Sequence, residues 1–150
     1  MKMETILNSY DQQTILQRIE LLKEDSKPQW GKMTSAQMLA HCNIALKQAI
    51  GTFKVKTHPL SIIGRLIKKT VLGPKPLQKN SSTDPTYIVA DPRNFAKEKS
   101  ELLATFSTLV ELGEKGFKAE KHPFFGKMTK EEWARITYKH LDHHLRQFGV

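Results

Sequence analysis

The stretch that decides the fold is "TKEEWARITYKHLDHHLRQF", which runs from Thr129 to Phe148. It opens with a capping box, Thr129-x-x-Glu132, in which each side chain satisfies a backbone amide at the start of a helix. Apolar residues then recur at the three- and four-residue spacing of one helical face. The pattern predicts an amphipathic helix that ends near Phe148 and packs its apolar face on a core.

Three segments upstream show the same helical spacing of apolar residues. The first is predicted to begin with Ser9 or Asp11 as its cap and to end near Pro28, because proline disfavours helical geometry in the residue before it. The second begins with a capping box at Thr34 and runs to Gly51.

The third upstream helix is predicted to have Asp91 as its cap and Pro92 at its first helical position, and to end at Gly113. Strand signals are nearly absent, since the only β-branched run is the short segment "TYIVA" at 86–90. Four amphipathic helices predict an all-α fold, a four-helix bundle in a single domain over residues 1–150.

The connection between the second and third helices, Thr52 to Ala90, is too long to lack structure of its own. Within it, "PLSIIGRLIKKTVL" (59–72) has the apolar spacing of a helix, with basic residues between the apolar ones. A basic amphipathic helix can lie on an anionic membrane. Gly64 weakens the helix, however, and such stripes usually pack on their own domain, so we expect this packing instead.

The net charge is +9, from 24 Lys and Arg against 15 Asp and Glu. Residues 51–83 carry seven of these basic residues and no acidic one. Such clusters gain affinity for nucleic acid by releasing counterions, but no exposed aromatic pattern or DNA-binding motif accompanies this one. A solvated basic connection is therefore favoured, and neither nucleic acid nor a membrane is the expected partner. The alternative is a non-enzymatic binding module that uses segment 51–83 on an acidic partner.

The cellular compartment is predicted from the cysteine count and from the apolar runs. Cys42 is the only cysteine, which rules out an internal disulfide and favours a reducing compartment. No apolar run approaches the length of a membrane span, and the N-terminal residues are too polar for a signal peptide. We expect a cytoplasmic protein.

Histidines cluster in the last predicted helix. His140 and His144 are four residues apart within its apolar stripe, whereas His143 lies about 60° from His140 at the margin. His41 lies at the edge of the stripe of the second helix, and facing helices of a bundle can bring it opposite the other two. The alternative for each is a buried histidine bonded to a carbonyl, but three histidines without an acidic partner favour a divalent metal ion. Zinc proteases need a glutamate where Leu141 stands, which excludes that class.

Five further residues are candidates for the wall of a pocket or for side chains that hold the metal ligands in place. They are Gln37, Gln48, His122, His143 and Gln147. Gln37 and Gln48 share the helical face of the histidine in the second helix. For His122, which lies in a loop before the last helix, the alternative is that it merely accompanies loop packing.

Two motifs resemble the DinB/YfiT-like superfamily of metal-dependent enzymes. They are "W-x-x-MTSAQMLAH", from Trp30 to His41, and "H-x-x-x-H-x-x-Q", from His140 to Gln147. The C-terminal tail, "HPFFGKMTKEEWARITYKHLDHHLRQFGV", resembles an uncharacterised branch of that superfamily. The resemblance implies a four-helix bundle, usually a homodimer, with nickel or zinc on His41, His140 and His144. It also implies a small-molecule substrate, in a metal-dependent transferase or hydrolase that works with a low-molecular-weight thiol.

Overall fold

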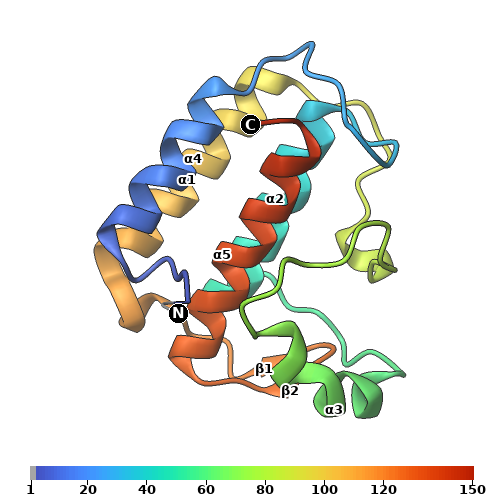
Figure 1. Ribbon diagram of the computed structural model, residues 1–150, viewed down its shortest axis with the longest axis vertical. Coiled ribbons are helices and arrows are strands. Elements are labelled where there is room, and N and C mark those ends of the chain that lie inside the picture. Colours follow the sequence, from blue (N-terminus) through green and yellow to red (C-terminus); the bar gives the residue numbers. More distant parts are fainter. Residues whose placement is uncertain (1–2) are drawn as a thin grey trace.

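The computed structural model describes residues 3–150 and is mostly helical (Figure 1). Within this range it has five α-helices, two 3₁₀ helices and one two-stranded sheet. In chain order these elements are α1 (Ser9–Leu21), α2 (Ser35–Ile50), α3 (Ser61–Val71), η1 (Pro85–Tyr87), α4 (Phe95–Leu112), η2 (Gly113–Gly116), β1 (Lys121–His122), β2 (Gly126–Lys127) and α5 (Lys130–Gln147).

Helices α1, α2, α4 and α5 lie side by side, and α3 stands apart at one end of the molecule next to the β1–β2 hairpin (Figure 1). Helix α2 contacts both α4 and α5, and α1 packs on the same two helices. Their apolar faces meet in one core that includes Ile15, Ile19, Leu39, Leu102, Phe106 and Leu141. This packing fixes α2 beside α5. No helix within residues 3–150 combines the length and the apolar character needed to cross a membrane.

The starts of α2 and α5 are as predicted. Thr34 and Thr129 each accept a hydrogen bond from the backbone amide three residues later, and both capping boxes are complete. The ends of α2 and α4 also agree with prediction, at Gly51 and Gly113. Gly51 adopts the left-handed conformation (φ 88°) that favours glycine after a helix.

The predicted cap and end of α1 are wrong. Asn8 caps the helix rather than Ser9 or Asp11, because its side chain accepts from two backbone amides of the first turn. The Asp11 carboxylate is buried and accepts instead from the amide of Thr5, 3.0 Å away. Helix α1 ends at Leu21, earlier than predicted, because the next residue is extended (φ −68°, ψ 132°).

The predicted cap of α4 is wrong for a similar reason. The Oδ1 atom of Asn94 accepts from the amide of Lys97 at 2.9 Å, so the helix begins at Phe95. The carboxylate of Asp91 pairs with the guanidinium of Arg93 instead, 3.0 Å away. A second good capping residue three positions downstream therefore displaces the first.

The long connection contains a helix where one was predicted, α3, but most of its apolar stripe faces solvent rather than the domain, and only Val71 packs against the core. Ile62 and Leu66 are 71% and 79% exposed. The segment 86–90 forms no strand, since η1 occupies its first half. The two strands lie in the loop before α5, where His122 pairs with Gly126, and they are too short for an alternating pattern to have revealed them.

Candidate metal centre

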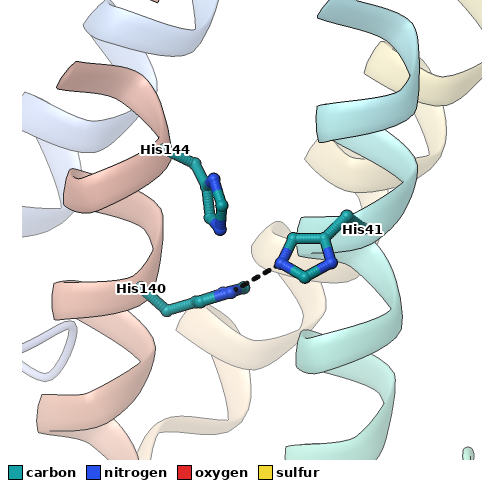
Figure 2. Close-up of side chains that lie close together, drawn as sticks. All are labelled: His41, His140 and His144. Carbon is teal, nitrogen blue, oxygen red and sulfur yellow. Dashed lines mark hydrogen bonds between the residues drawn. The ribbon is translucent and has the colours of Figure 1, made fainter. Parts of the chain in front are cut away.

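Three imidazoles from two helices meet between α2 and α5 (Figure 2). His140 and His144 project from successive turns of α5 toward His41 of α2. Each offers a nitrogen, and these nitrogens all lie within 4.8 Å of one another. His41 Nε2 and His140 Nε2 lie 2.9 Å apart. The structure thus brings together the three histidines singled out from the sequence.

The backbone of η1 fixes the tautomer of His41. Its Nδ1 atom lies 2.8 Å from the carbonyl oxygen of Tyr87. Because a carbonyl only accepts, Nδ1 carries the hydrogen, and a neutral ring then has a free lone pair on Nε2. This lone pair points into the cluster, since Nε2 is the atom that approaches His140.

A side-chain amide fixes the tautomer of His144 in the same way. Its Nδ1 atom lies 2.8 Å from Oε1 of Gln147. The Nε2 atom of Gln147 donates to the carbonyl of Trp30 at 2.7 Å, which leaves only the amide oxygen to face the imidazole. His144 Nδ1 therefore donates, and its Nε2 is free to act as a ligand.

Burial keeps the cluster neutral. Desolvation lowers the pKa of His41 and lowers that of His144 to about 3, and repulsion between the two rings adds to the effect in His144. The pKa of His140 is lowered well below its ordinary value for the same reasons, burial first and then the neighbouring histidines. Neutral imidazole is the form of histidine that binds metal ions.

The distance between the nitrogens of His41 and His140 fits a shared divalent ion. Two nitrogens bonded to one metal at about 2.0–2.1 Å, with roughly 90–110° between the bonds, lie about 2.8–3.4 Å apart. The contact of 2.9 Å between His41 and His140 falls in this range. Imidazole ligands suit zinc and nickel among the common divalent ions. Three protein ligands leave further coordination positions, as in catalytic rather than structural sites.

The cluster forms part of the wall of a cavity of about 790 Å³. The rest of the lining is largely apolar and aromatic. It comes from α2 and the segment 30–33 before it, from α3 and the residues just before it, from the segment 77–87, from the β1–β2 hairpin and from α5. Among these residues are Trp30, Leu46, Ile67, Phe124, Phe125 and Trp133. A small molecule in this cavity would reach the histidines directly, which is the arrangement expected of a binding or catalytic pocket.

The five other candidates are placed differently. His143 lines the cavity with its ring 5.5 Å from that of Trp30. Gln48 also lines it, and its Oε1 accepts from the Tyr87 hydroxyl at 3.2 Å. Gln37 does not line it, because its amide completes the cap of α2 and donates to the carbonyls of residues 90 and 91. Gln147 lines the cavity and holds a histidine, as described above.

His122 has a structural role in the hairpin in addition to lining the cavity. Its Nδ1 accepts from the backbone amides of Phe124 and Phe125, at 3.1 and 3.2 Å. Its ring also packs against Trp133, with centroids 5.3 Å apart. Burial lowers the pKa of His122 to about 4. It therefore shapes the turn between β1 and β2 as a neutral acceptor.

A family model described as a protein of unknown function, DUF1569, matches residues 1–149. The chain belongs to this family. No curated protein matches the sequence, and no solved structure matches it.

The long connection also contributes His58, Asp84 and Tyr87 to the cavity wall, although the sequence indicated none of them as a site residue. Asp84 followed by Pro85 is a helix-start signal, and the Asp84 carboxylate does accept from the Thr86 amide at 2.9 Å. Nothing local in the sequence indicates that this turn would fold over His41.

Proposed function

We propose that this chain binds one divalent metal ion through His41, His140 and His144 and uses it in a reaction on a small molecule. The observation that carries the proposal is the pair of hydrogen bonds that hold Nδ1 of His41 and of His144. Each directs an unprotonated Nε2 into the cluster, where the three ligand nitrogens lie within 4.8 Å of one another and a cation could share them.

When bound, a divalent ion on neutral ligands acts as a Lewis acid, which lowers the pKa of a bound water or thiol toward neutral pH. The chain's own residues do the rest. Tyr87 and Gln147 orient the ligands through a backbone carbonyl and an amide oxygen. The apolar walls of the cavity limit water and select an apolar portion of the substrate.

The reaction class that we propose is the transfer of a low-molecular-weight thiol to an electrophile, with hydrolysis as the alternative. This class rests on the resemblance to DinB/YfiT-like enzymes. Two further proposals rest on the same resemblance. One is that α1, α2, α4 and α5 form a four-helix bundle of that type, with α3 in its long connection. The other is that the protein is a homodimer. No carboxylate belongs to the ligand cluster, so the general base that we propose is a histidine such as His143 or the activated group itself, with Asp84 of the cavity wall as the alternative.

Elemental analysis of the purified chain tests the metal site. Protein exposed to zinc or nickel and then desalted is expected to retain about one ion per chain and to melt at a lower temperature after EDTA treatment. Retention of no ion under these conditions would exclude the proposal. A cobalt-loaded sample tests the thiol separately, because its visible absorption should change when 2-mercaptoethanol is added.

A further inference from the structure

Helix α3 presents its apolar face to solvent. Ile62, Ile63 and Leu66 are 71%, 51% and 79% exposed, and they lie on one side of the helix at three- and four-residue spacing. Contiguous apolar surface of this kind on a folded domain usually marks an interaction site. Figure 1 shows α3 at one end of the molecule, beside the β1–β2 hairpin.

The opposite face of α3 is fixed to the domain, so the apolar face cannot turn inward. Ser61 and Gly64 are buried. A Cβ atom on Gly64 would lie 2.1 Å from the carbonyl oxygen of Phe124, which shows how closely the helix backbone approaches the hairpin. Lys68 forms an ion pair with Glu132 of α5, with 2.9 Å between Nζ and Oε1. Rotation of the helix would break both contacts.

The surroundings of this face are basic. Segment 51–83 has no acidic residue. Lys54, Lys56, Lys69 and Lys75 are exposed, and none of them forms an ion pair within residues 3–150. Lys69 follows Ile62 by two helical turns and so flanks the apolar face directly. The partner that binds this surface must therefore bury apolar side chains and carry negative charge to pair with the lysines.

We propose that α3 docks on the surface of an anionic lipid bilayer. Ile62, Ile63 and Leu66 would enter the boundary between headgroups and acyl chains, and the exposed lysines would contact anionic headgroups. A second copy of the chain is disfavoured as the occupant, because a symmetric contact would bring the same lysines together and each chain carries a net charge of +9. Nucleic acid would match the charge but would leave the apolar side chains exposed.

This docking surface adjoins the cavity. Ile67 and Val71 of the same helix, and Leu60 directly before it, line the cavity wall. A bilayer against α3 would therefore lie next to the wall of the pocket and would favour substrates that partition into lipid. The docking itself does not depend on the metal proposed above.

Co-sedimentation of the purified chain with vesicles tests the proposal. We expect binding to phosphatidylcholine vesicles that contain phosphatidylserine, and at least about tenfold weaker binding to pure phosphatidylcholine or at high salt. The variant I62Q/L66Q should lose at least about tenfold in binding to the anionic vesicles, because both side chains leave the apolar face. The charge variant K69Q/K75Q should lose less, and only at low salt.

Matched variants on α1 and the loop after it serve as controls. L21Q replaces a leucine that is 64% exposed on a different helix, and K23Q/K27Q removes two charges outside segment 51–83. Both should bind vesicles like the wild type, and circular dichroism should show all variants folded. Wild-type protein that stays in the supernatant, or L21Q as defective as I62Q/L66Q, would overturn the proposal. A dimer in sedimentation that I62Q/L66Q dissociates would also overturn it in favour of a second copy, as would binding to duplex DNA in preference to anionic vesicles.

Discussion

Lys68 of α3 and Glu132 of α5 form an ion pair that is only about one quarter exposed, with 2.9 Å between Nζ and Oε1. The other carboxylate oxygen of Glu132 accepts the backbone amide of Thr129 at 2.9 Å and closes the capping box. Burial opposes ionisation of Glu132, but the Thr129 amide and the Lys68 ammonium outweigh it and lower its pKa. One carboxylate thus starts the helix that carries two of the histidines and also anchors α3.

A double-mutant cycle on this pair should give a measurable coupling. Gln at position 132 can still close the capping box, so Glu132→Gln removes the charge while keeping the cap. With Lys68→Met as the second change, we expect a coupling of about 0.5–1 kcal/mol from urea unfolding of the four proteins. The pair Arg135–Glu131, whose carboxylate is 70% exposed, should couple less. Equal coupling in the two pairs would contradict the anchoring role.

Single alanine variants of the three proposed ligands should each lose the metal. His41→Ala, His140→Ala and His144→Ala remove one nitrogen from the cluster, whereas His143→Ala leaves it intact. We expect isothermal titration with zinc to show a loss of affinity of at least about 100-fold in the first three and a small change in the fourth. Loss of zinc binding in His143→Ala together with retention in His144→Ala would show that the cluster has been assigned to the wrong histidines.

Gln147→Ala should weaken metal binding without removing a ligand. The variant releases Nδ1 of His144 from its acceptor and lets the imidazole change tautomer. Loss of such partners typically costs about 10–100-fold in metal affinity. Gln48→Ala is the matched control, because Gln48 is equally buried but bonds to the Tyr87 hydroxyl rather than to an imidazole. Equal losses of affinity in both variants would indicate general destabilisation instead of ligand orientation.

The metal-free protein should lose stability as the pH falls below 6.5. The pKa of His122 is lowered to about 4 by burial, so between these values the unfolded chain binds the proton and the folded chain does not. The free energy of unfolding then falls by about 1.4 kcal/mol per pH unit for this histidine, or roughly 2 kcal/mol by pH 5.

The variant His122→Asn isolates that contribution. Asn retains an acceptor for the amides of Phe124 and Phe125 but does not titrate. Denaturant unfolding in EDTA at pH 7 and pH 5 should therefore show a smaller loss of stability in the variant than in the wild type, by roughly 2 kcal/mol. If the free energy of unfolding falls equally with pH in the two proteins, His122 is not a neutral, buried histidine.

Gly64→Ala should detach α3 from the hairpin even though alanine favours helices. The new methyl group would overlap the carbonyl oxygen of Phe124, so the helix must shift and its contacts loosen. We expect a cost of about 1–3 kcal/mol and faster amide exchange in α3. Thr70→Ala, at an exposed position of the same helix, should be neutral or stabilising. A fully stable Gly64→Ala protein would contradict the close approach.

The features that the sequence predicted well depend on residues a few positions apart. The capping boxes at Thr34 and Thr129 involve partners three residues away, so they form wherever the chain forms a helix. The shared face of His140 and His144 follows from the helical repeat alone. Their meeting with His41 needed only the further assumption that α2 faces α5.

The features that could not be predicted from the sequence depend on contacts between segments that are far apart in the chain. The turn at Tyr87 reaches His41 across 46 positions, and no local pattern encodes that fold-back. The orientation of α3 is set by the approach of Gly64 to the hairpin and by Lys68, and both contacts override the usual tendency of an apolar stripe to face its own domain. Gln37 was placed on the correct helical face, but the carbonyls of the connection captured its amide.

The contact between His41 and His140 joins positions that are 99 residues apart in the chain. An ion held by both would cross-link most of the polypeptide into one closed loop, and unfolding would have to release the ion before the two helices could separate. If the ion is released slowly, the bound ion would lengthen the lifetime of the folded state more than it would raise the free energy of unfolding. Binding of the metal ion would then determine how long each protein molecule resists proteolysis, whether or not substrate is present.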